Sequence, residues 1–159
     1  MNRDLHGAEL IKLQPGTKRP WPTIVFHLSP PQETIQEMME IRDLYLSHNT
    51  QVNVWIGIKL TGCMGCAQKA SWWIGVAHRN FIPGSPPSTP PPNNWPPSIM
   101  LHELPPEQKA DVIIKDIEWK IPTWLICHPH SVPDLEPPLP ENLVLSPEIF
   151  RKQIIYFGY

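Results

Sequence analysis

The sequence predicts an α/β domain: a mixed β-sheet flanked by helices, with a proline-rich insertion over residues 82–98. Three segments carry this prediction, namely a β-branched run at 22–28, apolar residues at helical spacing within 32–48, and an alternating pattern over 51–60. The chain has 159 residues, which is near the commonest size of one domain. We therefore expect a single domain spanning residues 1–159.

The first predicted elements are two strands. Residues 6–21 are interrupted by glycines and prolines, and their one apolar stretch, at 10–13, predicts a short strand. The run at 22–28 is rich in β-branched and aromatic residues, ends before Pro30, and has the length of a buried strand.

A helix and a third strand follow. Residues 32–48 contain no glycine or proline and place their apolar residues on one broad stripe, which predicts a helix. Residues 51–60 carry apolar residues at alternate positions, which predicts a strand. Because parallel strands need a connection long enough to cross the sheet, 22–28 and 51–60 are predicted to be parallel neighbours in a right-handed crossover.

Residues 72–78 follow a turn that contains glycine and cysteine, and they predict a strand that pairs with 51–60 as a hairpin. Eight of the sixteen residues from 82 to 97 are proline. This density excludes helix interior and central strand, and it favours polyproline II or disorder.

The last third of the chain predicts less regular structure. Apolar runs at 99–101, 112–119 and 124–127 predict edge strands and coil. Ser146-Pro147-Glu148 predicts the start of a helix that runs to about residue 156, since serine is a common N-cap and proline suits the first helical position.

Composition limits the classes of function. A net charge of -2 and a pI near 6.4 disfavour nucleic-acid binding driven by bulk positive charge, while leaving room for a local basic patch. The first residues lack the apolar run of a secretory signal, and no stretch approaches the roughly 18 apolar residues of a membrane span. We therefore expect an intracellular protein, cytoplasmic or nuclear, that does not enter a membrane.

Three cysteines argue against a disulfide framework and for reduced thiols or a metal site. Cys63 and Cys66 form a CxxC pair, and with Cys127 and His128 they could make a tetrahedral zinc site. The second half lacks the paired spacing of specific zinc motifs. A thioredoxin-like redox role is also disfavoured, because that motif places its first cysteine at a helix N-terminus that stabilises the thiolate, whereas this CxxC pair leads into a predicted strand. A tight turn with small buried thiols is therefore the preferred interpretation.

Tryptophan and proline are both abundant. The seven tryptophans could stack on bases, but such surfaces normally interleave lysine and arginine, which are sparse beside these residues, so core packing is favoured. The proline tract could bind the aromatic groove of a proline-recognising protein. It contains no lysine or arginine, which favours a spacer role.

The middle of the chain has a recognisable arrangement. Residues 22–32 read PTIVFHLSPPQ, the predicted helix ends in DLYL at 43–46, and residues 52–59 read VNVWIGIK. This order resembles the core of PD-(D/E)XK restriction-endonuclease-like proteins, and most of all an uncharacterised fungal group with the approximate pattern P-(S/T)-V-V-x-E-V-G-x-S, helix, V-x-V-x-I-x-I-K. The specific part covers residues 8–59. The resemblance implies a restriction-endonuclease-like core and metal-dependent cleavage of DNA.

The resemblance also assigns site residues. Glu9 stands at the acidic position of that family, His27 at the position of its Glu, and Ser29 at the position of its Lys. Mg²⁺ prefers carboxylate oxygen, so an imidazole at this position removes charge from the site. Loss of the lysine removes a cation that would position water or offset phosphate charge, and Arg42 or Lys59 could replace it.

Three function classes follow from these observations. The first is a nuclease-like domain, catalytically degenerate, in which Glu9 and His27 would bind Mg²⁺ or Mn²⁺ and DNA would be the substrate if activity remained. The second is a non-catalytic module that meets a protein partner through the proline tract. The third is a structural domain held together by zinc.

Overall fold

The computed structural model describes residues 23–62, 71–81, 95–105, 117–126 and 140–150. Their largest element is a four-stranded mixed sheet with the strand order β1-β2-β3-β4. The strands are β1 (Ile24–Ser29), β2 (Val54–Thr61), β3 (Ser71–Arg79) and β4 (Ser98–Leu104). The predicted α/β class is therefore confirmed.

Helix α1 (Ile35–Tyr45) connects β1 to β2, which are parallel, as the sequence predicts. The helix begins at a capping box, in which the Thr34 hydroxyl accepts a hydrogen bond from the Glu37 amide at 3.1 Å. The Glu37 carboxylate in turn accepts one from the Thr34 amide at 2.7 Å. This reciprocal cap explains why the helix begins at Ile35 rather than at residue 32.

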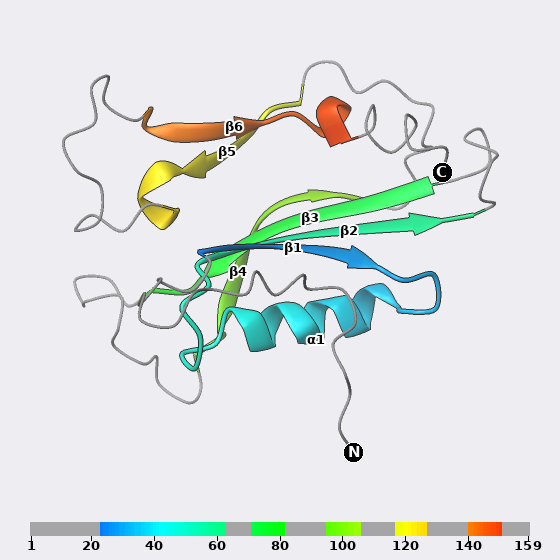
Figure 1. The fold of residues 1–159 in the computed structure, drawn as a ribbon, viewed down its shortest axis with the longest axis horizontal. Coiled ribbons are helices and arrows are strands. Elements are labelled where there is room, and N and C mark those ends of the chain that lie inside the picture. The colour runs from blue at the N-terminus through cyan, green and yellow to red at the C-terminus, as the bar shows by residue number, and fades with distance from the viewer. Residues whose placement is uncertain (1–22, 63–70, 82–94, 106–116, 127–139, 151–159) are drawn as a thin grey trace, which may run out of the picture.

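Strands β2 and β3 form the predicted antiparallel hairpin, and β4 continues the sheet in antiparallel fashion. A second sheet of two antiparallel strands, β5 (Trp119–Pro122) and β6 (Asn142–Leu145), lies on the face opposite α1 (Figure 1). A short 3₁₀ helix, Thr123–Leu125, follows β5. The four-stranded sheet therefore has α1 on one face and a second sheet on the other.

The chain becomes helical again at residues 147–150. The Ser146 hydroxyl accepts a hydrogen bond from the Glu148 amide at 3.3 Å, which agrees with the predicted N-cap. The predicted continuation to about residue 156 lies outside the described residues.

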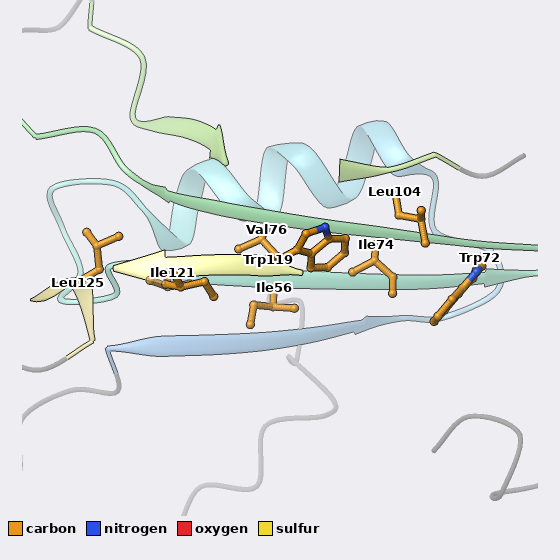
Figure 2. Packing of buried hydrophobic residues seen from close by; sticks show 9 residues of the cluster. Ile56, Trp72, Ile74, Val76, Leu104, Trp119, Ile121 and Leu125 are labelled. Carbon is orange, nitrogen blue, oxygen red and sulfur yellow. The ribbon is translucent and has the colours of Figure 1, made fainter. Parts of the chain in front are cut away.

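Two apolar clusters hold these layers together. The cluster between the two sheets contains Val54, Ile56, Trp72, Ile74, Val76, Leu104, Trp119, Ile121 and Leu125 (Figure 2). The cluster beneath α1 contains Met38, Leu46, Val52, Trp55, Trp73 and Ala77. Successive side chains of a strand point to opposite faces, so the adjacent Trp72 and Trp73 belong to different clusters.

Four tryptophans, at positions 55, 72, 73 and 119, are buried, which confirms core packing for them. Trp95 and Trp124 are partly exposed, and Trp21 lies outside the described residues. The predicted strand at 10–13 and most of the proline-rich insertion also lie outside them. Across the described ranges, no helix is long and apolar enough to cross a membrane.

Candidate functional site

The ends of two parallel strands bring together three residues that the resemblance assigned to the site or its neighbourhood. In the register of β1 and β2, His27 lies opposite Gly57, and Ser29 lies opposite Lys59. Since side chains two positions apart share a face, His27, Ser29 and Lys59 all lie on the face covered by α1. In sheets with parallel strands, the carboxyl ends of the strands are the usual location of ligand sites.

Lys59 is buried, with 6% of its surface exposed, and its ammonium group binds oxygen atoms of the β1–α1 turn. Its Nζ donates to the Ser29 hydroxyl at 3.5 Å, to the Pro31 carbonyl at 3.3 Å, and to the Glu33 carbonyl. Three oxygen acceptors match the three donors of an ammonium group. Lys59 therefore fixes the turn that leads into α1.

The groups that stabilise the charge of Lys59 are carbonyl and hydroxyl dipoles rather than a carboxylate. Within the described ranges, the ion pairs are His27 with Glu33 and Arg42 with Asp43, and neither includes Lys59. A buried charge is costly unless polar groups satisfy it, and here the turn supplies them. The ammonium is thus committed to holding the backbone.

His27 is paired with a residue that the sequence analysis did not single out. Its Nε2 lies 2.9 Å from Oε2 of Glu33, and both side chains are largely buried. A carboxylate only accepts hydrogen bonds, so Nε2 carries the proton in this contact. The other ring nitrogen, Nδ1, is buried and has no hydrogen-bond partner among the described residues.

Two buried indole rings, those of Trp55 and Trp73, lie beside His27. The rings of His27 and Trp55 meet edge to face with centroids 6.0 Å apart, and those of Trp55 and Trp73 lie 6.2 Å apart. The Trp55 ring covers Gly57, where an added Cβ would fall 2.0 Å from the ring, and the Trp73 ring covers Gly75 in the same way. The two glycines are register partners, so they leave room for both rings side by side.

A carboxylate lies on β4, at the other end of the row of register partners that begins at His27. Glu103 on β4 is opposite Gly75, and its Oε1 accepts a hydrogen bond from Trp73 Nε1 at 2.6 Å. The row across the four strands therefore reads His27, Gly57, Gly75, Glu103. Its two polar ends are separated by buried aromatic rings, so Glu103 and His27 do not form one polar site.

Arg42 belongs to a different cluster. Its Nε donates to Asp43 at 2.8 Å, and the same carboxylate oxygen accepts a hydrogen bond from the Ser98 hydroxyl at 2.6 Å. Ser98 is opposite Arg79, whereas Lys59 is opposite Trp73, so the two clusters lie about 20 Å apart along β3. The structure thus brings Lys59, and not Arg42, to His27.

Arg79 stabilises the same end of the sheet as Arg42. Its guanidinium donates to the carbonyl and the hydroxyl of Thr50, in the loop that follows α1. Burial lowers the pKa of this guanidinium. These contacts close the connection between α1 and β2, which gives Arg79 a structural role.

The remaining predicted site residues, Glu9, Cys63, Cys66, Cys127 and His128, lie outside the described residues. In the parts of the chain that the structure describes, no group of three or more His, Cys, Asp or Glu side chains could hold a metal ion. The metal sites suggested by the sequence, with Mg²⁺, Mn²⁺ or Zn²⁺, therefore stay predictions.

Sequence reasoning missed Glu33. It lies six positions after His27, in a turn with two prolines, and nothing in its spacing distinguishes it from a solvated carboxylate. Only the path of the turn brings it back over β1.

No family model, curated protein or solved structure matches this chain.

Proposed function

We propose that this chain is a nuclease-like domain that no longer cleaves DNA and that serves as a non-catalytic module. The proposal starts from the resemblance to PD-(D/E)XK proteins, in which His27 and Ser29 replace a metal-binding carboxylate and a lysine. The contacts of these two residues support it. His27 is held by Glu33, and Ser29 is held near Lys59.

The position of the Lys59 ammonium is the observation that carries the proposal. A lysine that assists phosphodiester cleavage needs free donors for water or phosphate. The donors of Lys59 are directed at Ser29, Pro31 and Glu33 instead.

A cleavage assay on the full-length chain tests this proposal. Supercoiled plasmid and single-stranded DNA are incubated with Mg²⁺ or Mn²⁺ and either the unaltered chain or the Glu9→Ala or Glu33→Gln variant. We expect no cleavage above the level of the variants. Metal-dependent cleavage that either substitution abolishes would show that the site is active and would refute the proposal.

A second candidate function concerns the proline-rich segment, and one observation favours it. Asn80, at the end of β3, donates its backbone amide to the Pro97 carbonyl at 3.0 Å and its side-chain amide to the Pro96 carbonyl at 3.1 Å. Asn80 is buried, so both ends of the segment 82–94 are tied to one point of the sheet. We propose that this rigid base presents the segment to a proline-recognising partner inside the cell, in the cytoplasm or the nucleus.

This second candidate is tested by binding. A peptide of residues 82–98 and the full-length chain are titrated against a panel of SH3 and WW domains, beside a variant in which glycine and serine replace residues 82–94. Binding by the chain and the peptide, lost in the variant, is the expected result, since aromatic grooves recognise preformed polyproline II. Equal binding by the variant would contradict this role.

A further inference from the structure

Strand β1 has an open edge within the described residues. It is the first strand in the sheet order, and β2 is its neighbour. The amide of Val54 donates to the carbonyl of Thr23, so the backbone groups of residue 23 face β2. Backbone groups alternate in direction along a strand, so those of Ile24, Phe26 and Leu28 face away from β2. Their amides and carbonyls need partners from water or from another segment.

The side chains along this edge are apolar and exposed. Phe26 is 62% exposed and Leu28 is 66% exposed, and both lie on the face away from α1. Edge strands are usually protected by lysine, proline or a bulge. The strand reads IVFHLS and contains neither of these residues, and its pairing with β2 is regular. The protection of this edge therefore has to come from outside the strand.

The segment joined to β1 is long enough to reach this edge. Residues 1–22 lie outside the described residues, and they lead into Thr23, directly before the strand begins. Their one apolar stretch, LIKL at 10–13, is connected to β1 through residues 14–23. A connection of about ten residues spans up to about 33 Å, whereas neighbouring strands lie only about 4.8 Å apart. The stretch can therefore lie beside β1.

We propose that residues 10–13 pair with β1 as an added strand and close this edge of the sheet. The pairing is antiparallel, because a parallel neighbour needs a crossover of a dozen or more residues, usually a helix. The connection 14–23 is shorter, and its three prolines and one glycine exclude a helix. Pro15 and Gly16 follow closely after the stretch, and both are residues typical of a turn that reverses the chain.

The side chains decide which face of the added strand lies toward which face of the sheet. In a strand, Ile11 and Leu13 share one face, and Lys12 lies on the other. Placing the apolar pair beside Phe26 and Leu28 covers exposed apolar surface, whereas the opposite choice brings the lysine to it. Residues directly opposite in an antiparallel pair share a face, so this choice also turns the amides of residues 11 and 13 toward β1.

The covalent connection favours this segment over a strand from another molecule. Attachment through a short connection gives an effective concentration in the millimolar range. A second copy of the chain at micromolar concentration would therefore meet an edge that is already occupied. The segment 10–13 thus prevents the sheet from extending into a neighbouring molecule, which is the hazard of an open edge.

Hydrogen exchange of the full-length chain tests this proposal. The outward amides of β1, at residues 24, 26 and 28, should exchange slowly, and to the same extent at low and high protein concentration. Ile11→Pro removes one amide donor of the added strand and should speed exchange at these three amides about tenfold or more. The matched control is Leu5→Pro, which lies in the same segment but outside the proposed strand and should leave the exchange unchanged.

A second variant acts through the side chain alone. Ile11→Lys keeps the backbone donor and places a charge against the apolar pair of β1, so it should also speed exchange at the three outward amides. The amide of Ile56, in the middle of β2 and between two strands, should exchange slowly in every variant, which shows that the sheet is still folded.

Three outcomes overturn the proposal. Fast exchange at the outward amides of the unaltered chain would show that the edge is open to water. Slow exchange that both Ile11 variants leave unchanged would show that a different segment covers the edge. Protection that appears only as the protein concentration rises would identify a second copy of the chain as the occupant.

Discussion

Replacing Gly57 by alanine tests how tightly the Trp55 ring packs over this glycine beneath α1. An added Cβ at this position would lie 2.0 Å from Cη2 and 2.4 Å from Cζ2 of Trp55, whereas ordinary contacts begin near 3.4 Å. The ring would therefore have to move by about 1.4 Å, the difference between 3.4 and 2.0 Å. It has little freedom to do so, because Trp55 is fully buried between His27 and Trp73.

Two effects of the Gly57→Ala substitution compete. Overpacking of a core costs about 1–3 kcal/mol. Alanine also loses less backbone entropy on folding than glycine, which returns about 0.5–1 kcal/mol. The steric cost is larger, so the free energy of unfolding should fall by about 1–2 kcal/mol. For a chain of this length, that loss lowers the Tm by about 2–8 °C.

Thermal unfolding followed by circular dichroism measures this change. The cause is isolated by repeating the substitution in a Trp55→Phe background, where the ring atoms that meet the new Cβ are missing. There Gly57→Ala should be neutral or slightly stabilising, and the two substitutions should not be additive. An equal loss of stability in both backgrounds would show that the indole is not responsible. Trp124→Phe, at an exposed position, serves as the control background.

Three other outcomes are expected. Thr34→Ala removes the capping box of α1 and should cost about 0.5–2 kcal/mol, whereas Gln36→Ala, in the first turn of the same helix, should change the unfolding midpoint little. Asn80→Ala leaves the Pro96 carbonyl without its donor and should cost about 1 kcal/mol, whereas Asn49→Ala at an exposed position should not. Equal effects in a variant and its control would refute the assigned contact. Elemental analysis should find well below one zinc per chain, since the cysteine and histidine spacing is not that of a specific zinc motif, and one full equivalent would restore the zinc hypothesis.

Much of the central architecture was predictable because it depends on local patterns. The alternation within 51–60 and the absence of glycine and proline from 32–48 report which residues can face a core. The parallel pairing of β1 and β2 follows from the length of the connection between them, and the hairpin of β2 and β3 follows from the shortness of theirs. These features need no knowledge of distant contacts.

The second sheet was not predictable in the same way. Strands β5 and β6 have four residues each and are separated by a segment rich in proline, so neither carries enough periodicity to indicate its partner. Their pairing places Trp119 and Ile121 over the four-stranded sheet, where they bury Ile74 and Val76 (Figure 2). Such an arrangement is decided by the burial of apolar surface between segments distant in sequence.

The candidate site also has a part that local sequence patterns predict and a part that only contacts between distant segments decide. The amino-acid order by itself determined which strands end together, and so placed His27, Ser29 and Lys59 near the carboxyl ends of two neighbouring strands. Only the tertiary structure decided what these side chains do there, because the turn after β1 returns Glu33 to His27 and carries the carbonyl groups that hold Lys59. Strand patterns fix the positions of residues along a sheet, whereas the partners of a buried charge depend on the path of an irregular turn, for which the sequence has no periodic signal.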